Sequence, residues 1–534
     1  MQPSQRIAAV LIFPAIAYLG AACERTDSPT GARPMASVVG PAPLLVDDDL
    51  IQCPTAQYTS IQVAVTAAAP GDHIDVCPGT YNEQVTIPAG KDNIRLRSTR
   101  RWGAIIKAPA VMALDPFVTP AYTIVRIAGA QNTTILAFTI TGPGPGPCGS
   151  LHYGVRVHTG GSADILGNHI TQIKDNVPSG CQNGVAILVG RWVDATTGSA
   201  RIIGNVIDDY QKNGPTVDNT GSHAEIVNNR ILSAPSGIIA RNGIQVSRGA
   251  TADIRHNFVS ENVYTPSTDA STGILFYGSG LVLSDHNTLT ANDVGVYMFT
   301  YMLFEGGPCV NAAGSVTAHN RVRASNSDGL IVSGFAPAFC SVTGVEAAQN
   351  KSDNNGGQGI GVYDADDDKV DDNFVENSGR SGILLDNADN STIGHNQVRQ
   401  NGTADGDLTD GIRVEASSKG NTLQSNHLRD NVTHDCHDNS IGLGTAGTAN
   451  SWVNDHGETS LPPGLCGKDD DDADFETSTV YGWDAAYPWY DAFDIAAEFD
   501  WAAAYATIDT ESLLRLVPAA RTGGIRRSPP SPNQ

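Results

Sequence analysis

The sequence predicts an all-β fold: a right-handed parallel β-helix, which is a solenoid of stacked coils, with an N-terminal capping helix and a poorly ordered C-terminal tail. Two short motifs recur from about residue 124 to residue 431 at irregular intervals of roughly 23 to 37 residues, a period typical of solenoids. Apolar and variable positions alternate within each motif, which predicts short strands with one face inward. Because no stretch between the motifs suits a crossover helix, the parallel strands must coil, each coil ~4.8 Å from the last.

The first motif is a glycine followed by apolar, variable and apolar residues, and it occupies residues 154–157, 184–187, 243–246, 273–276, 295–298, 359–362, 382–385 and 411–414. The second motif is apolar-x-x-Asn-x-apolar, with full copies centred on Asn168, Asn205, Asn229, Asn257, Asn373, Asn396 and Asn426 and partial copies at Asn287 and Asn320. We place this asparagine at a bend, where its side chain can bond backbone groups left free by the turn. Since every coil needs it, we expect a structural ladder rather than a catalytic role.

A short amphipathic helix is predicted before the repeats. Ser60 is a suitable N-cap, Pro70 and Gly71 end the helix, and one helical face carries Ile61, Ala64, Val65 and Ala68. Such a helix would plug the open end of the coil and shield its edge strands. The predicted segments are, in order, a signal peptide at 1–22, a flexible tether at 23–46, the N-terminal cap at 47–73, the β-helix at 74–466 and an acidic, aromatic-rich tail at 467–534.

The N-terminus predicts export. Arg6 precedes an apolar run at residues 7–22, which ends in small residues as a cleaved signal peptide does and is short for a membrane span. The small residues before Cys23 resemble a bacterial lipoprotein box, with Cys23 as the acylated residue. Simple secretion is the alternative, because Gly20 replaces the usual leucine. We therefore expect a cell-envelope lipoprotein or a secreted protein that meets the membrane only through a lipid anchor.

Eight further cysteines fall into four pairs that are close in sequence. An even number in an exported chain predicts disulfides, although free buried thiols are the alternative. The pairs, inferred from proximity alone, are Cys53 with Cys77, Cys148 with Cys181, Cys309 with Cys340, and Cys436 with Cys466.

The charge of the chain restricts its partners. The formal net charge is −24, which repels nucleic acids and anionic membrane surfaces. It also disfavours an acidic polysaccharide, unless cations such as Ca²⁺ bridge the two. We expect a monomer without a nucleic-acid partner.

Residues 58–72, YTSIQVAVTAAAPGD, and residues 76–85, VCPGTYNEQV, resemble the opening of pectate-lyase-like right-handed β-helix proteins. The later repeats resemble the parallel β-helix repeat found there and in NosD-type periplasmic proteins. The resemblance spans roughly residues 50 to 466. It implies the fold and a functional groove outside one sheet, but the superfamily includes lyases, hydrolases, epimerases and adhesins, so it implies no single activity. No catalytic motif of the family matches, including the Asp-Pro-His of the epimerases.

Alternation predicts which side chains point outward from the glycine-motif strands. Tyr277, Tyr297, Phe299 and Tyr363 would form an exposed aromatic strip, on which the apolar faces of sugars can stack. The alternative is that a long loop, such as residues 301–313, covers these rings. Nearer the N-terminus, Arg156 and His158 also point outward and are candidate substrate-binding residues.

Asp386 and Glu415 are the candidate catalytic carboxylates. They point outward from adjacent coils, so their carboxylates could approach to about 5 Å, a separation used by retaining glycosidases. Arg413 is next to them. The alternative is an ordinary solvated acid pair on an acidic protein.

Two groups of residues are candidate metal sites. Asp364, Asp366 and Asp368 belong to a crowded acidic turn whose oxygens could hold Ca²⁺, the one candidate cofactor, although the spacing of an EF-hand is missing and a plain acidic turn is the alternative. Four histidines directly precede the repeat asparagine, and a stack of imidazoles could bind Cu or Zn; they are His256, His286, His319 and His395. Other coils place Gly, Asn, Gln, Asp or Ser there, which favours a tolerant surface position.

The leading functional prediction is an exported surface protein that binds extracellular polysaccharide along the outer sheet face. The alternatives are a polysaccharide lyase or glycoside hydrolase that uses the same face, and a structural or adhesive scaffold without catalysis. A metal-handling role like that of NosD-type proteins is a more distant alternative.

Overall fold

The computed structural model describes residues 42–116, 120–178, 180–234, 238–265, 270–302, 309–310, 312–334, 341–404 and 406–468. The predicted signal peptide, most of the tether with Cys23, and the tail beyond residue 468 lie outside the described residues. Cys340, the predicted partner of Cys309, also lies outside them. Among the described helices, none is long and apolar enough to cross a membrane.

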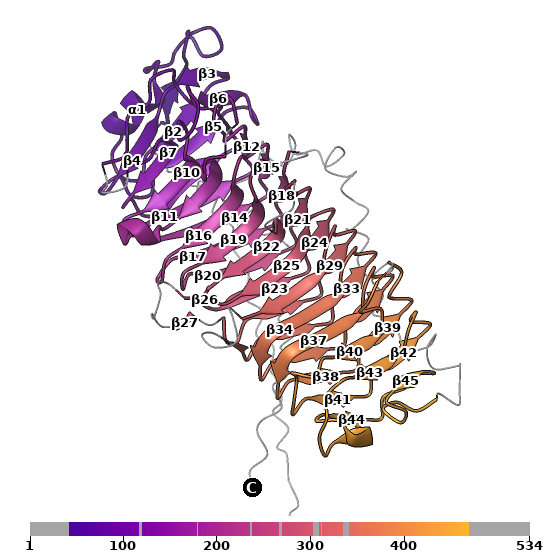
Figure 1. Ribbon diagram of the computed structural model, residues 1–534. Coiled ribbons are helices and arrows are strands. Elements are labelled where there is room, and N and C mark those ends of the chain that lie inside the picture. Colours follow the sequence, from indigo (N-terminus) through magenta and orange to yellow (C-terminus); the bar gives the residue numbers. More distant parts are fainter. Residues whose placement is uncertain are drawn as a thin grey trace, which may run out of the picture. The chain divides into compact units, whose positions relative to one another are not determined.

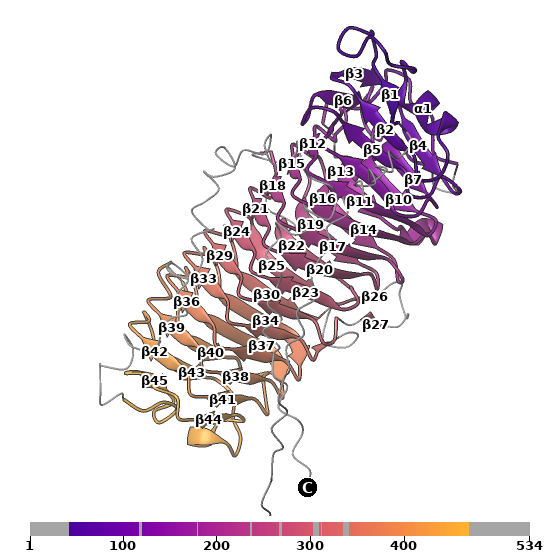
Figure 2. The ribbon, with the colours of Figure 1, turned by 180° about the vertical axis from the view of Figure 1, so that it is seen from behind.

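The described residues form a parallel β-helix of three long sheets, as the sequence predicts (Figures 1 and 2). Sheet A contains β1 (Leu44–Val46), β2 (His73–Val76), β5 (Arg95–Ser98), β8 (Thr133–Leu136), β11 (Gly161–Leu166), β14 (Gly198–Ile203), β17 (His223–Val227), β20 (Thr251–Arg255), β23 (Val282–Asp285), β28 (Val316–Ala318), β32 (Glu346–Ala348), β35 (Lys369–Asp371), β38 (Thr392–Gly394), β41 (Thr422–Gln424) and β44 (Ser451–Val453). Sheet B contains β3 (Gly79–Asn82), β6 (Ala104–Lys107), β9 (Thr139–Thr141), β12 (His169–Thr171), β15 (Val206–Asp208), β18 (Arg230–Leu232), β21 (Phe258–Ser260), β24 (Thr288–Thr290), β29 (Arg321–Arg323), β33 (Lys351–Asp353), β36 (Phe374–Glu376), β39 (Gln397–Arg399) and β42 (His427–Arg429).

Sheet C carries the glycine motif. It contains β4 (Val85–Pro88), β7 (Thr123–Ala128), β10 (Tyr153–His158), β13 (Val185–Val189), β16 (Asn213–Asp218), β19 (Asn242–Ser247), β22 (Thr272–Tyr277), β25 (Val294–Phe299), β30 (Leu330–Ser333), β34 (Ile360–Asp366), β37 (Ile383–Asp389), β40 (Ile412–Val414), β43 (Cys436–Asp438) and β45 (Ser460–Leu461), with β31 (Val342–Thr343) beside β34. Between β25 and β28, β26 (Tyr301–Met302) and β27 (Cys309–Val310) form a small antiparallel pair. Two short 3-10 helices, η1 (Trp192–Asp194) and η2 (Thr445–Gly447), complete the described elements.

The repeat asparagines form the predicted ladder. In each step the backbone N–H of one asparagine donates to the Oδ1 of the asparagine in the next coil, as from Asn229 to Asn257 at 3.0 Å and from Asn257 to Asn287 at 2.9 Å. The side-chain amide of Asn257 also donates to the carbonyl of Ile226 at 2.8 Å. Asn350 joins the same ladder, accepting from Asn320 at 3.0 Å; the motif missed it because Ser352 replaces the apolar residue. The ladder satisfies backbone groups at the corner between sheets A and B in coil after coil.

The N-terminal cap is helix α1 (Ile61–Ala67), which buries Ile61, Ala64 and Val65 at the end of the β-helix (Figure 1). Ser60 is the N-cap, and its hydroxyl accepts from the Val63 N–H. The carboxylate of Glu83 adds a second cap, because it accepts from the N–H groups of Ile61 and Gln62 at 2.8 and 3.0 Å. One boundary differs from the prediction: β1 already pairs with β2, so the sheet begins within residues assigned to the tether.

Three of the four predicted disulfides lie among the described residues, and all three have the predicted partners. They are Cys53–Cys77, Cys148–Cys181 and Cys436–Cys466. Each closes a loop of about one coil, because a coil contacts its neighbours along the stack.

Candidate functional site

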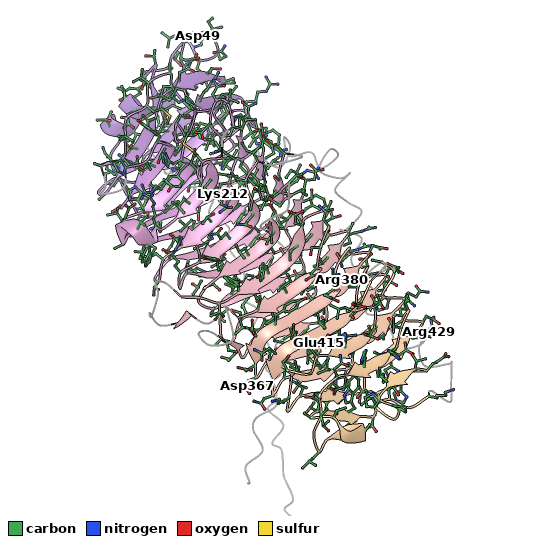
Figure 3. The ribbon with its side chains drawn as sticks, viewed as in Figure 1. Asp49, Lys212, Asp367, Arg380, Glu415 and Arg429 are labelled. Atoms are coloured by element: carbon green, nitrogen blue, oxygen red, sulfur yellow. A yellow bond between two sulfur atoms is a disulfide. The ribbon has the colours of Figure 1, made fainter. Side chains whose placement is uncertain are left out.

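The outer face of sheet C is the candidate functional surface, and two columns of outward side chains run along it. The register places the first column at Arg126, Arg156, Leu188, Thr216, Gln245, Leu275, Tyr297, Ile331, Gly361, Leu384, Arg413 and His437. The second column contains Asp218, Ser247, Tyr277, Phe299, Ser333, Tyr363 and Asp386. Figure 3 shows the side chains of the described residues as sticks, with Lys212 labelled towards the N-terminal half and Glu415 on the C-terminal half. The predicted alternation is confirmed, because Val296 and Met298 are buried whereas Tyr297 and Phe299 are partly exposed.

Three of the four predicted aromatic residues form one cluster. The ring centroids of Tyr277 and Phe299 are 5.8 Å apart in a stacked arrangement, and those of Tyr297 and Phe299 are 5.5 Å apart edge to face. All three are half-buried. Both arrangements are favourable for aromatic rings, so the cluster is a preformed apolar surface across two coils. Residues 303–308 and 311, in the loop suggested as an alternative cover, lie outside the described residues.

Tyr363 lies two coils further along the second column and is anchored separately. Its hydroxyl donates to Asp328 Oδ2 at 3.4 Å, and its ring lies over Gly361, where an added Cβ would approach the ring to 2.4 Å. Burial raises the pKa of Tyr363, and the nearby Asp328 carboxylate raises it further. Burial also raises the pKa of Asp328. The contact therefore joins two poorly solvated polar groups next to the aromatic cluster.

The sequence did not predict that the cluster continues towards the N-terminus through Trp192 and Arg248. The Arg248 guanidinium lies 6.0 Å from the Tyr277 ring and 5.9 Å from the Trp192 ring, within cation–π range. Asp218 holds both, accepting from Arg248 Nη1 at 2.7 Å and from the Trp192 N–H at 2.9 Å. Trp192 lies in η1 outside the repeat motifs, so periodicity carried no signal for it.

Arg156 and His158 point outward as predicted, but they are buried rather than available to a ligand. Arg156 is 0% exposed and forms ion pairs with Asp115 at 2.9 Å and Asp194 at 2.6 Å. Burial, together with the nearby charge of Arg156, lowers the pKa of His158 to about 3. The expectation of an exposed substrate-binding pair is therefore wrong, because segments between the strands cover this part of sheet C.

At the C-terminal end, Arg413 and Glu415 belong to a charged network. Arg413 donates to Glu415 Oε1 at 2.5 Å and to Asp410 Oδ2 at 3.0 Å. Asp410 also contacts the Nδ1 atoms of His434 and His437 at 3.0 and 2.9 Å. Burial alone would raise the pKa of Asp410, but these hydrogen bonds and positive charges lower it. None of these three residues was predicted as a site residue. Asp410 lies outside the repeat motifs, and His434 and His437 flank a disulfide cysteine.

The predicted carboxylate pair is divided between different partners. Asp386 is exposed and accepts from the Ser417 hydroxyl at 3.0 Å. Glu415 instead accepts from Arg413 and from the Asn439 amide, the latter at 3.1 Å. Glu415 therefore joins the network around Asp410, whereas Asp386 has its own local contact.

The predicted Ca²⁺ ligands Asp364, Asp366 and Asp368 do not converge. Asp364 accepts from Asn387 at 2.7 Å, Asp366 from the Ser341 hydroxyl at 2.6 Å, and Asp368 from the Val345 N–H at 2.9 Å. Residues 364 and 367 have positive φ, which breaks the alternation that would have placed the three carboxylates on one face. Asp368 is buried, and this burial raises its pKa to about 8.

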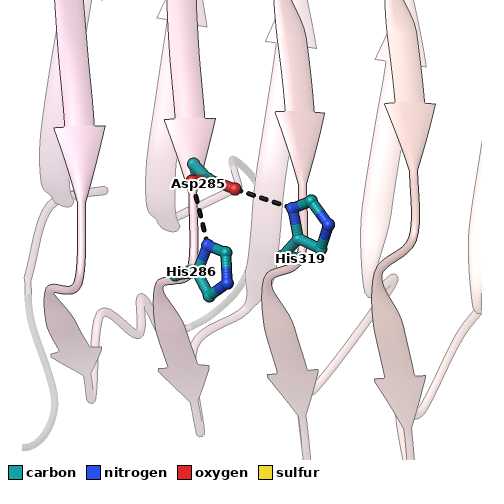
Figure 4. Close-up of side chains that lie close together, drawn as sticks. All are labelled: Asp285, His286 and His319. Carbon is teal, nitrogen blue, oxygen red and sulfur yellow. Dashed lines mark hydrogen bonds and ion pairs between the residues drawn. The ribbon is translucent and has the colours of Figure 1, made fainter. Parts of the chain in front are cut away.

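The structure brings the predicted histidines together at the corner between sheets A and B. Asp285 lies between His286 and His319, with oxygen–Nδ1 distances of 2.9 and 2.8 Å (Figure 4). The two imidazoles are stacked, with centroids 4.7 Å apart, and the His256 ring is 5.2 Å from that of His286. His395 is further along the corner and contacts Asp371 at 2.9 Å. Among the described residues, four groups of acidic residues or histidines have potential metal-ligand atoms within 4.8 Å of one another. Two of these groups are at this corner.

Comparison with known proteins agrees with the architecture. Residues 123–303 match the family model described as "Right handed beta helix region", and residues 305–455 match the one described as "Periplasmic copper-binding protein (NosD)". No curated protein matches the sequence. The family matches and the sheet topology show that the chain is a right-handed parallel β-helix repeat protein.

Several solved structures are similar to the chain. The A-module of the mannuronan C-5 epimerase AlgE6 of Azotobacter vinelandii has 15% identity and a TM-score of 0.38, covering 74% of this chain and 88% of that chain. A double mutant of the periplasmic alginate epimerase AlgG has 13% identity and a TM-score of 0.40, covering 67% and 79%. A mutant DFA-IIIase of Arthrobacter chlorophenolicus A6 in complex with DFA-III has 14% identity and a TM-score of 0.40, covering 73% and 93%.

Proposed function

We propose that this protein binds a polysaccharide along the outer face of sheet C. The observation that carries the proposal is the half-buried cluster of Tyr277, Tyr297 and Phe299, continued by Arg248 and Trp192. Aromatic rings present large apolar areas on which the CH faces of sugars stack, and a contiguous exposed apolar patch usually marks a binding surface. Successive coils are ~4.8 Å apart, so the rings follow the stack and suit a chain-like ligand.

The charge of the chain favours a neutral polysaccharide. With a formal net charge of −24, the protein repels a polyanion at long range. An acidic polysaccharide would need cations such as Ca²⁺ between its carboxylates and those of the protein. A neutral polysaccharide needs only stacking on the aromatic surface and hydrogen bonds from the polar side chains around that surface.

Affinity electrophoresis tests this function, because a polysaccharide in the gel retains a protein that binds it. The panel contains xylan, mannan and dextran as neutral chains, and alginate and polygalacturonate with and without Ca²⁺. We expect retention by a neutral chain, and replacing both Tyr297 and Phe299 with alanine should weaken it by roughly 1 to 3 kcal/mol. Phe258→Ala is the matched control, because that half-buried ring also lies near a guanidinium but on sheet B. No retention by any member, or equal retention by the double variant, would contradict the proposal.

A second candidate function is catalysis at the C-terminal end of the same face. It is favoured by the network in which Asp410 holds His437 and Arg413, and Arg413 holds Glu415. Such a set offers an acid, a base and a cation close together. If it is catalytic, Glu415→Gln or His437→Gln should abolish release of reducing ends from the bound polysaccharide while retention persists. Full turnover in both variants would remove the network from catalysis, and Asp386→Asn then tests the remaining predicted carboxylate.

We propose that the protein acts outside the cytoplasm as a monomer, either anchored through Cys23 or secreted. The disulfides support an oxidising compartment. Cys23→Ser should move an acylated protein from the membrane fraction into the soluble fraction of its native host. Unchanged membrane partitioning would contradict acylation, and a reduced protein recovered from the cytoplasm would contradict export.

A further inference from the structure

The corner between sheets A and B holds three side chains in an arrangement that the proposed polysaccharide face does not use. Asp285 ends β23, His286 follows it directly, and His319 occupies the position of His286 in the next coil. Both histidines have left-handed backbone conformations, with φ of 54° and 52°, so their side chains leave the corner in the same direction. The stack therefore places equivalent positions of two coils beside each other.

The asparagine ladder holds this corner rigidly. His286 precedes Asn287 and His319 precedes Asn320, and the Asn287 N–H donates to Asn320 Oδ1 at 2.9 Å. Asn287 also donates to the Ile254 carbonyl at 3.0 Å, and Asn320 donates to that of Ser284 at 3.1 Å. Because ligand positions that are fixed before binding lose less entropy, a site at this corner is preorganised.

The three side chains offer a mixed nitrogen and oxygen ligand set that solvent can reach. Asp285 contacts Nδ1 of His286 at 2.9 Å and Nδ1 of His319 at 2.8 Å, and the imidazoles are nearly parallel at 19° (Figure 4). Their side chains are 37%, 20% and 34% exposed.

We propose that Asp285, His286 and His319 bind a divalent first-row transition-metal ion such as Zn²⁺ or Cu²⁺. Imidazole nitrogen with carboxylate oxygen suits these ions, whereas Ca²⁺ and Mg²⁺ prefer oxygen alone. His256, whose ring is 5.2 Å from that of His286, supplies a further imidazole beside the site. Asp285 and His286 precede residues 305–455, which match the NosD model, whereas His319 lies within them. The proposal rests on the contacts among the three side chains and not on that match.

The same corner contains an internal comparison. In later coils, Asp371 and Asp372 lie beside His395, with Asp371 Oδ1 2.9 Å from His395 Nδ1. This group has one imidazole instead of two, and Lys369 also pairs with Asp371 at 2.8 Å. A cation that already neutralises the carboxylate competes with a metal ion, so we expect the Asp285 group to bind more tightly.

An imidazole at this position is not needed for folding. The equivalent residue is Gln349 in the coil after His319 and Ser425 in a later coil, and both have the same left-handed conformation. If Asp285 and the histidines form only surface ion pairs and bind no metal ion, these pairs contribute ~0–1 kcal/mol to stability. Glutamine substitutions are therefore suitable probes, because the fold already contains that residue.

The test is isothermal titration calorimetry of the full, untagged chain with Zn²⁺ after treatment with a chelator, together with Cu²⁺ electron paramagnetic resonance. We expect stoichiometric Zn²⁺ binding that weakens at least tenfold in H286Q and in H319Q, with thermal midpoints close to that of the wild type. Bound Cu²⁺ should show nitrogen hyperfine coupling that is lost in the double variant.

Two control variants should leave the tight site intact. H395Q alters the one-imidazole group at the same corner, and H169Q removes another histidine that pairs with an aspartate, Asp208, on sheet B. No Zn²⁺ or Cu²⁺ binding by the wild-type chain, or equal binding by the H286Q/H319Q variant, would overturn the proposal. These measurements contain no polysaccharide, so their outcome is independent of the function proposed for sheet C.

Discussion

At the N-terminal end of sheet C, the outward Arg156 is fully buried between Asp115 and Asp194. Further along the same column, the outward Tyr297 is half-buried and contacts the Phe299 ring. The two residues occupy equivalent positions on equivalent strands.

Segments inserted between the strands make this difference. Asp115 lies between β6 and β7, and Asp194 lies in η1 between β13 and β14. Both reach over the outer face and cover the end near β10. In a β-helix, strand alternation decides the direction of a side chain, whereas insertions between strands decide whether a ligand can reach it. The part of the face around Tyr277, Tyr297 and Phe299, where the rings are half-buried, is therefore a better candidate for binding than the end near β10.

Removing the buried guanidinium should have the largest effect. Arg156→Met leaves Asp115 and Asp194 without this partner in a desolvated site, and breaking a buried pair costs ~3–5 kcal/mol. We expect a clear fall in the urea midpoint of unfolding. Unfolding is monitored by tryptophan fluorescence under oxidising conditions. Arg97→Met is the control, because the Arg97–Asp75 pair is partly exposed and should contribute only ~0–1 kcal/mol. Equal midpoints for the two variants would contradict the difference between the two regions.

The C-terminal half contains a buried carboxyl group, that of Asp368. Its pKa is raised to about 8 by burial and then by Asp366 and Asp367, whereas a carboxyl in the unfolded chain titrates near 3.8. Because the folded pKa is the higher one, its stabilising contribution is fully present below pH ~4 and is lost as the pH rises towards 8.

Asp368→Asn should remove this pH dependence. We expect the variant to gain stability relative to the wild type between pH 5 and pH 9, reaching ~1–3 kcal/mol at the upper end. The measurement is the urea midpoint at several pH values. A constant difference across this range would show that Asp368 titrates normally.

Shortening an outward ring should cost little stability compared with shortening an inward one. Phe299→Ala removes a half-buried ring and its aromatic contacts, at ~1 kcal/mol. Phe276→Ala, in the preceding coil, removes a fully buried ring and should cost ~3–5 kcal/mol. Thermal unfolding of both variants measures the difference. Similar losses would mean that residues around β25 cover the aromatic cluster.

The smallest effect is expected for Asp386→Asn. Asp386 is exposed and accepts a hydrogen bond from the Ser417 hydroxyl, which can donate equally well to an asparagine oxygen. The free energy of unfolding, measured by urea denaturation, should change by less than ~0.5 kcal/mol. A larger loss would place Asp386 in the network around Asp410 after all.

The sequence by itself determined the repeating parts of this protein. Period-two alternation in the glycine motif decided the inward and outward faces of sheet C, and the recurrent asparagines predicted the ladder, including the step from Asn257 to Asn287. Ser60 and the apolar residues after it predicted α1. These features depend on residues within one coil or its immediate neighbour, so local patterns contain the required information.

Only the tertiary structure decided which outward residues are accessible and which groups meet. Asp115 reaches Arg156 from 41 residues away, and no motif in either segment indicates that contact. The acidic turn fails to gather its carboxylates because two residues in it have positive φ, whereas Asp285 unites His286 with His319 across neighbouring coils. Coil lengths vary with each insertion, so the register that brings these side chains together depends on backbone hydrogen bonds between coils rather than on a fixed spacing in the sequence.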